Sequence, residues 1–174
     1  MATILLALML ATAAPPQAAV SAKPLTPVQQ RMLRAHNEER LRVRHKPLIW
    51  SAKLSADAQR WAHKLARSDR FEHAAGADNS ADDGENLWMG TKNAFPVEQM
   101  VDAWVRERRL FKPGIFPDIS TNGNWEDVGH YTQLIWHSTT AVGCAIGSSP
   151  TYDYLVCRYN PAGNWIDENP LKPR

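Results

Sequence analysis

The sequence predicts an α+β fold in which helices come first and strands come last. Segments with the apolar spacing or the capping residues of helices occupy the first two thirds of the chain. The last third changes to short apolar runs bounded by turn residues, which are typical of strands. This order favours a layered α+β domain over a doubly wound parallel sheet, in which strands and helices alternate along the chain.

The N-terminus has the layout of a secretory signal peptide. An apolar run from Ile4 to Ala14 carries no charge, and the first charged side chain is Lys23. The run is too short to cross a bilayer as a helix, which needs roughly 20 apolar residues. Small residues at 11–13 and 20–22 suit cleavage by signal peptidase. We therefore expect residues 1–22 to be a signal peptide and leader; the alternative is a frayed apolar tail on a cytosolic protein.

The rest of the chain, residues 23–174, fits one domain large enough to bury a core of its own. The 20 basic and 18 acidic residues are mixed along the sequence and leave a formal net charge of +2. No stretch has the charge density of a nucleic-acid patch or a polybasic membrane anchor. We expect a secreted or extracellular protein, periplasmic in a Gram-negative bacterium, with no transmembrane anchor and no nucleic-acid partner.

The first predicted helix follows the leader. Thr26 has the side chain of an N-cap, and Pro27 suits the first helical position. We expect the helix to continue to about Arg44. Lys46 marks its limit, because the residue before a proline, here Pro47, is pushed out of helical conformations.

A second helix is capped by Ser51 or Ser55 and ends near Ser68. Its apolar residues recur with the spacing of one helical face: Leu54, Ala58, Trp61, Ala62 and Leu65. His63 lies opposite this face, so we expect it to be exposed to solvent.

The third helix starts near Pro96, and its inward face is formed by Val97, Met100, Val101 and Trp104. Residues 75–83, which precede it, are rich in Gly, Asp, Asn and Ser and predict a loop. The segment from Phe111 to Trp125 holds two prolines, two glycines and three Asn or Asp residues. It predicts a long irregular loop, and such loops are usually functional or mobile.

Three strands are predicted in the last third of the chain: His130 to Trp136, Val142 to Ile146, and Tyr154 to Tyr159. Turn residues at 147–150 separate the last two, which predicts a hairpin.

The two cysteines, Cys144 and Cys157, both fall in this hairpin. There is no CxxC motif, and an exported chain meets an oxidising environment, which favours a disulfide over a metal or redox pair. Closing a loop of this size contributes about 3 kcal/mol in the chain-entropy model.

Four ionisable residues are candidates for a functional site. Glu107 continues the inward face of the third helix, three residues after Trp104. Burying an unpaired carboxylate is costly, so Glu107 needs a polar cleft or a partner, and the alternative to a cleft is an ion pair with Arg108 or Arg40.

The other three candidates lie where elements begin or end. His73 closes the second helical region, Glu85 begins an apolar stretch, and His130 opens a predicted strand. Two imidazoles and two carboxylates are a set that can bind zinc or perform acid–base chemistry. The chain contains no H-E-x-x-H and no G-x-S-x-G motif, so sequence spacing alone does not show that the four residues converge.

Longer motifs resemble those of a known family. Residues 129–139, GHYTQLIWHST, and residues 155–165, LVCRYNPAGNW, resemble the two signatures of the CAP superfamily: the cysteine-rich secretory, antigen 5 and pathogenesis-related 1 proteins. Supporting motifs are His36-Asn37-x-x-Arg40, residues 84–87 (GENL) and Trp104-x-x-Glu107. The likeness extends, in order, over nearly all of the chain after the leader.

The resemblance implies a three-layer α-β-α sandwich with a central antiparallel sheet, formed by one CAP (SCP) domain over residues 23–174. It also implies a cleft tetrad of two histidines and two glutamates, here His73, Glu85, Glu107 and His130. In relatives the histidines bind Zn²⁺ or a similar divalent ion while the glutamates line the cleft. His36 is implied to be structural.

The chain departs from the family pattern in two respects. Many eukaryotic relatives carry three disulfides in this domain, whereas this chain has two cysteines and room for one. Plant relatives contain a C-terminal peptide of the form P-x-G-N-x5-P-Y. This chain has residues 161–164 (PAGN) and Pro170, but Leu171 replaces the tyrosine, which argues against a peptide-signal role.

The sequence favours non-enzymatic binding as the function. The resemblance implies a metal in the cleft together with a lipid, sterol or extracellular protein ligand. The Trp, Phe, Ile and Pro residues of the loop from Phe111 to Trp125 would cover an apolar groove, or would simply complete the core.

Two alternatives are weighed against it. In a metal-dependent hydrolase of protease type, Glu85 or Glu107 would serve as the base that activates a metal-bound water. Known zinc hydrolases usually present three protein ligands, which weighs against this reading. In a pure protein-interaction module, the tetrad would be vestigial.

Removal of the leader is directly testable. We expect mass spectrometry of the exported protein to show a mature N-terminus between about Ala14 and Lys23, because cleavage follows the small residues after the apolar run. An exported protein that retains Met1 would contradict the prediction.

Overall fold

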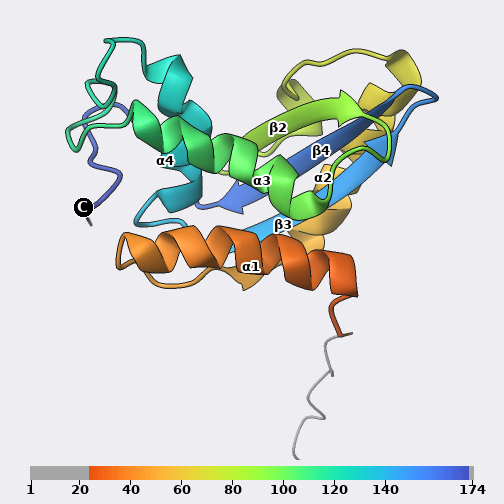
Figure 1. Cartoon of the computed structure of the whole chain (residues 1–174), viewed down its shortest axis with the longest axis horizontal. Coiled ribbons are helices and arrows are strands. Elements are labelled where there is room, and N and C mark those ends of the chain that lie inside the picture. The colour runs from red at the N-terminus through yellow and green to blue at the C-terminus, as the bar shows by residue number, and fades with distance from the viewer. Residues whose placement is uncertain (1–23, 173–174) are drawn as a thin grey trace, which may run out of the picture.

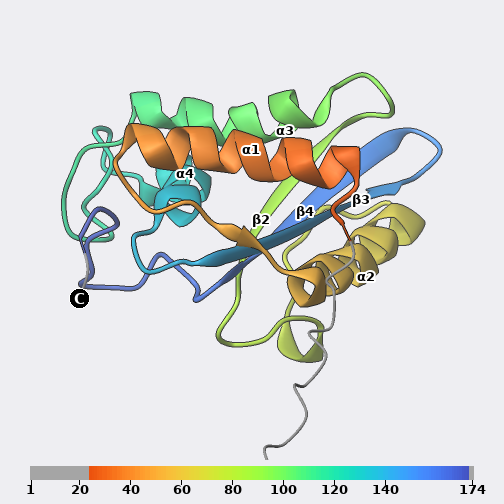
Figure 2. The same cartoon turned by 90° about the horizontal axis from the view of Figure 1, so that it is seen from below.

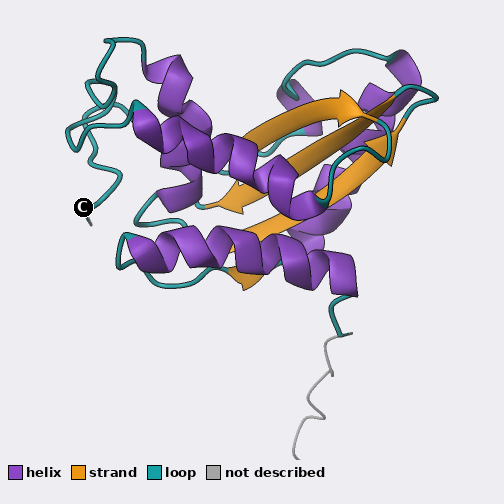
Figure 3. Ribbon diagram, in the orientation of Figure 1, coloured by secondary structure: helices purple, strands orange, loops and turns teal. Residues whose placement is uncertain are grey.

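The computed structural model describes residues 24–172, so the predicted leader lies outside the described residues. The described chain forms an α+β sandwich of three layers (Figures 1 and 3). A four-stranded sheet lies between α2 on one face and α1, α3 and α4 on the other (Figure 2). The predicted fold class is therefore confirmed. Within residues 24–172, no helix is long and apolar enough to cross a membrane.

Helix α1 spans Pro27–Arg42 and begins as predicted. Thr26 accepts a hydrogen bond from the backbone N–H of Gln29, whose side chain in turn accepts one from the backbone N–H of Thr26, which completes a capping box. The buried face of α1 is largely polar: Met32, His36, Glu39 and Arg40. An apolar stripe of the usual kind is therefore absent from this helix, and specific hydrogen bonds hold it to the domain.

Helix α2 spans Ala52–Ser68, with Ser51 as its N-cap. All five residues of the predicted apolar face are buried, and His63 is exposed as expected. The helix lies very close to the sheet. A β-carbon at Gly143 would overlap the backbone of Ser55, and one at Gly147 would overlap the backbone of Ala62. These two glycines let α2 cover β3 and β4 directly.

The sheet has the strand order β1-β3-β4-β2. Strands β3 (Ala141–Ser148) and β4 (Tyr152–Asn160) form the predicted hairpin, and each extends two residues further toward the turn than expected. Strand β2 (Gly84–Thr91) pairs antiparallel with β4. The sequence indicates only an apolar stretch at this position and does not predict the strand. The two-residue β1 (Ile49–Trp50) adds a short parallel edge to β3.

The disulfide between Cys144 and Cys157 is present, and the two residues are directly opposite each other in the β3–β4 register. It joins the two central strands of the sheet beneath α1 and α3, where both sulfurs are buried. The predicted pairing is confirmed.

The predicted strand from His130 to Trp136 is wrong, because Gly129–Ile135 forms helix α4. Six of its seven residues are buried, so the segment has no exposed face and shows no helical alternation in the sequence. Its aromatic and β-branched residues favour strands, and tertiary packing overrides that preference.

Helix α3 spans Val97–Val105 and buries the four predicted inward residues. It continues into a 3₁₀ turn, η2 (Arg106–Arg109), which contains Glu107. Two further 3₁₀ turns, η1 (Gly76–Asp78) and η3 (Trp125–Val128), lie in the predicted loop 75–83 and at the end of the loop that begins at Phe111.

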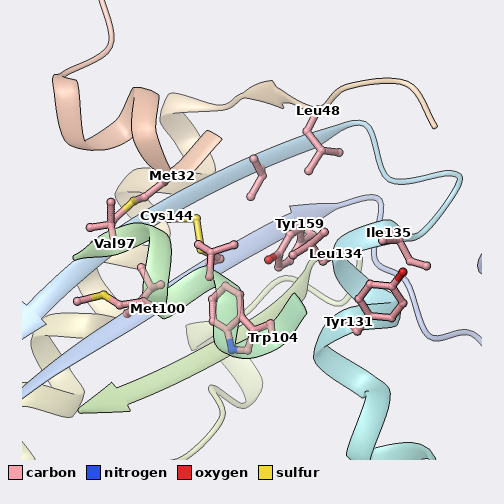
Figure 4. Packing of buried hydrophobic residues seen from close by; sticks show 14 residues of the cluster. Met32, Leu48, Val97, Met100, Trp104, Tyr131, Leu134, Ile135, Cys144 and Tyr159 are labelled. Carbon is pink, nitrogen blue, oxygen red and sulfur yellow. A yellow bond between two sulfur atoms is a disulfide. The ribbon is translucent and has the colours of Figure 1, made fainter. Parts of the chain in front are cut away.

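The largest hydrophobic cluster lies between the sheet and helices α1, α3 and α4 (Figure 4). Trp104 and Met100 of α3 meet Met32 of α1 there, and Tyr131 and Leu134 of α4 close the far end. A second cluster joins the apolar face of α2 to the opposite face of the sheet. The first cluster packs α3 against α4, and η2, which continues α3, contacts α4 as well.

His36 is the most deeply buried ionisable group of α1. Its Nδ1 donates to the Met32 carbonyl at 2.8 Å, so Nε2 accepts from the hydroxyl of Tyr159, also at 2.8 Å. Burial lowers the pKa of His36 to about 4, and the ring is neutral in the folded protein at neutral pH. The structural role expected for His36 agrees with these contacts.

The buried imidazole predicts an acid-labile fold. In the unfolded chain the pKa of a histidine is about 6.5, above the folded value, so acidification protonates the unfolded state first. The stabilisation from neutral His36 is complete above about pH 6.5 and is lost as the pH falls toward about 4, at a cost of up to about 3 kcal/mol. His45, whose pKa burial also lowers, contributes in the same direction.

Urea unfolding across this pH range is the measurement. His36→Gln should flatten the pH dependence of the free energy of unfolding, whereas His63→Gln, at an exposed position, should leave it unchanged. Identical pH profiles for the wild type and His36→Gln would contradict the prediction.

Candidate metal centre

The four candidate residues form two histidine–glutamate pairs. Nδ1 of His73 lies 2.7 Å from Oε1 of Glu85, and Nδ1 of His130 lies 2.6 Å from Oε1 of Glu107. His73 comes from the segment after α2 and Glu85 from β2, whereas Glu107 comes from η2 and His130 from the first turn of α4. Each pair thus joins two elements that are distant in sequence.

In the first pair, the carboxylate is buried and the imidazole is open. The side chain of Glu85 is 4% exposed and that of His73 is 62% exposed. Oε1 of Glu85 also accepts the backbone N–H of Ala74 at 3.0 Å, which holds the segment that carries His73 against β2. The carboxylate therefore fixes both the ring and its backbone.

Arg158 compensates the charge of Glu85. This arginine is not among the residues predicted from the sequence. The two residues are directly opposite each other on β4 and β2, and Arg158 Nη2 lies 2.8 Å from Glu85 Oε2. The contact has the distance of an ion pair but not the alignment of a hydrogen bond, since Glu85 Oε2 has no aligned donor. The signal in the sequence is Arg158 itself, a charged residue inside the apolar run of β4. Its pairing with Glu85 depends on β2 being a strand beside β4, which the sequence does not predict.

The guanidinium of Arg158 also contacts the loop that precedes β2. It donates to the side chain of Asn79 and to the carbonyl of Asp78 at 3.2 Å. Because Arg158 itself is buried, it ties this loop to the inner end of the His73–Glu85 pair.

In the second pair, Glu107 holds the start of α4. Its Oε1 contacts His130, and its Oε2 accepts the backbone N–H of Tyr131 at 2.9 Å. The indole of Trp104 stacks on the His130 ring, with centroids 6.1 Å apart and planes 14° from parallel. The carboxylate and the stacked indole together fix the imidazole.

The alternative partners weighed for Glu107 are occupied elsewhere. Arg108 pairs with Glu39 at 3.1 Å, and Arg40 donates only to backbone carbonyls. The inward carboxylate of Glu107 belongs to the histidine.

His73, Glu85 and His130 line one cavity of about 630 Å³. The predicted long loop, η3 and the C-terminal segment add apolar residues to its lining, together with Glu126 and Asn164: Phe116, Pro117, Trp125 and Ile166. A larger cavity of about 720 Å³ between α1 and α3 contains none of the four residues. Three members of the tetrad therefore line a cavity of mixed polar and apolar character, and Glu107, which contacts His130, does not line it.

The two imidazoles have the arrangement of metal-binding histidines. Within residues 24–172, no hydrogen bond engages Nε2 of either His73 or His130, while each Nδ1 faces a carboxylate. Histidine ligands usually donate the N–H of their second nitrogen to a carboxylate, which fixes the tautomer and the ring. The donor set fits a divalent ion bound through the two Nε2 atoms.

The geometry limits such a site to few protein ligands. Among the described residues, one group of three His, Cys, Asp or Glu residues has ligand atoms within 4.8 Å of one another: His36, Cys144 and Cys157. Its sulfurs are joined in the disulfide and are not available as thiolates. No three members of the tetrad come that close, so the cleft offers two imidazoles and leaves other coordination positions open.

An α-β-α sandwich with two histidine–glutamate pairs facing one cavity defines a CAP-type domain. Residues 33–159 match the cysteine-rich secretory protein family, CAP. The chain is 34% identical to pathogenesis-related protein 1C of Nicotiana tabacum over 143 residues, which cover 82% of this chain and 80% of the relative. The chain belongs to the CAP family.

Other relatives agree with this membership. Cysteine-rich secretory protein 2 of Homo sapiens is 36% identical over 148 residues, which cover 79% of this chain and 57% of that protein. Among solved structures, NaASP2 with Zn²⁺ matches with a TM-score of 0.69 at 23% identity, over 83% of this chain and 85% of that one. BmVAL-1 matches with a TM-score of 0.68 at 24% identity, over 86% and 84% of the two chains. These structural matches support the fold.

The ion pair behind His73 has a testable cost. Arg158→Met leaves the buried Glu85 carboxylate without its cation, and removing one member of a buried pair typically costs about 3–5 kcal/mol. Arg106→Met removes an exposed pair with Asp102 and should cost less than about 1 kcal/mol. Urea denaturation of both variants is the measurement, and equal losses of stability would contradict the role given to Arg158.

Proposed function

We propose that this protein is an exported, non-enzymatic CAP-domain protein that binds Zn²⁺ or a similar divalent ion in its cleft. His73 and His130 are the ligands, through Nε2, and Glu85 and Glu107 orient them. The observation that carries the proposal is the pairing of each Nδ1 with a carboxylate while both rings line the same cavity. A structural relative described with Zn²⁺ supports the proposal by analogy.

The same cavity favours an apolar organic ligand beside the ion. Phe116, Trp125 and Ile166 line the same cavity as His73 and His130, and Trp125 is exposed although its ring contacts that of Phe116. A lipid or sterol, or an apolar segment of an extracellular protein, has the surface to cover this wall. Mass spectrometry of an organic extract of the exported protein distinguishes a lipid from a protein ligand.

A metal-dependent hydrolase remains the second candidate, and the site supports it less well. Both tetrad carboxylates are already engaged, Glu85 by His73, Ala74 and Arg158, and Glu107 by His130 and Tyr131. A general base needs a carboxylate within reach of the attacking water, and neither is free for that task. The alternative of a protein-interaction module predicts that partner binding survives loss of both histidines.

Zinc binding is measured by calorimetric titration of the metal-stripped protein. The wild type should bind zinc with an affinity below that of a closed four-ligand site, because the proposed site has two protein ligands. His73→Ala/His130→Ala should lose the binding, whereas His63→Ala, on the exposed side of α2, should retain it. Circular dichroism should show the same fold in all three, since neither imidazole belongs to the hydrophobic clusters. Undiminished zinc binding by the double variant would show that the site is assigned to the wrong residues.

A further inference from the structure

A third cavity, of about 400 Å³, lies where the C-terminal ends of α1 and η2 meet the C-terminal segment. It shares no lining residue with the metal cleft. Three arginines and an apolar wall surround it, and we call it the arginine pocket: Arg42, Arg44, Arg108, Phe111, Tyr131 and Leu171. Figure 2 shows these ends of α1 and α3 on the same side as the C-terminus.

A buried carboxylate holds two of the arginines in place. Glu39, whose side chain is 6% exposed, lies 2.7 Å from Nη2 of Arg42 and 3.1 Å from Nη1 of Arg108. Nε of Arg42 donates to the same carboxylate at 2.9 Å, and the hydroxyl of Tyr131 donates to it at 3.0 Å. Because each guanidinium carries five donors, both arginines keep N–H groups for a ligand while their positions are fixed.

The third arginine has no partner of its own. Within residues 24–172, the side chain of Arg44 makes no hydrogen bond and no ion pair. Its backbone is left-handed, with φ of 61°, at the turn that follows α1. A non-glycine residue in this conformation is uncommon, and here it places an arginine at the edge of the pocket.

The C-terminal end of α1 does not need this side chain as a hydrogen-bond donor. The last carbonyls of α1 already accept backbone N–H groups: Val43 donates to Glu39, Arg44 to Leu41, and His45 to Arg40. The guanidinium of Arg44 is therefore free to bind a ligand rather than needed as a cap.

The charge of the pocket matches a dianion. Three guanidinium groups and the Glu39 carboxylate leave a formal charge of +2. A phosphate monoester carries about −1.5 to −2 at neutral pH, and its oxygens fit the fork of a guanidinium. Phe111, Tyr131 and Leu171 provide an apolar wall for the group esterified to the phosphate. We propose that the arginine pocket binds a phosphate monoester that carries a small apolar or aromatic group.

Phenyl phosphate is the probe, titrated at constant ionic strength and followed by calorimetry and by NMR shifts of the pocket residues. We expect saturable binding. Arg44→Gln should weaken it by about tenfold or more, because the substitution removes one charged hydrogen bond to the phosphate. Arg67→Gln, which removes the same charge from the exposed side of α2, is the matched control and should bind like the wild type. No saturable binding, or equal weakening in both variants, would overturn the proposal.

Two further experiments test where the phosphate binds and whether the natural ligand is a lipid or a soluble molecule. Binding should persist in His73→Ala/His130→Ala, and loss there would place the phosphate in the metal cleft and overturn the proposal. Phosphatidylcholine vesicles with and without phosphatidic acid test a lipid source of the same group. Vesicle binding that depends on phosphatidic acid and on Arg44 supports a lipid monoester, and binding of phenyl phosphate alone supports a soluble one.

Discussion

The buried guanidinium of Arg40 is the contact on which the arrangement of the helical layer depends. It is 1% exposed and donates to the carbonyls of Lys46, Leu134, Trp136 and Thr139 at 2.9–3.0 Å. Burial lowers its pKa to about 10, so it stays charged at neutral pH. Burying a cation is costly unless its donors are satisfied, and here backbone carbonyls satisfy them. One side chain of α1 thereby fixes the end of α4 and the turn that leads into β3.

This anchor and Glu107 hold the two ends of α4. Arg40 binds the carbonyls at its C-terminal end, and Glu107 accepts the N–H of Tyr131 at its N-terminal end. His130, in the first turn, therefore has little freedom, and stacking on Trp104 removes more. Across the cavity, Arg158 fixes Glu85, which fixes His73. The two pairs are thus supported separately, and both imidazoles line the same cavity.

The tetrad cleft and the arginine pocket share one structural feature, in which a shielded carboxylate orients more exposed groups. Glu85 and Glu107 orient imidazoles, and Glu39 orients two guanidinium groups. Tyr131 lies between the two sites, because its N–H donates to Glu107 and its hydroxyl donates to Glu39. In each proposed site, the carboxylates pre-organise the more exposed groups that we propose bind the ligand.

The sequence alone determined the features that depend on neighbours along the chain. Capping residues and helical spacing predicted α1, α2 and α3, turn residues predicted the β3–β4 hairpin with its disulfide, and helical phase turned Glu107 inward. The other three tetrad residues followed from resemblance to the family. Only the tertiary structure decided that residues 129–135 form a helix, because burial on every side leaves no periodic signal. It alone also paired Glu85 with Arg158 and grouped the arginines around Glu39, since residues far apart in sequence become partners only through the packing of the sheet and helices.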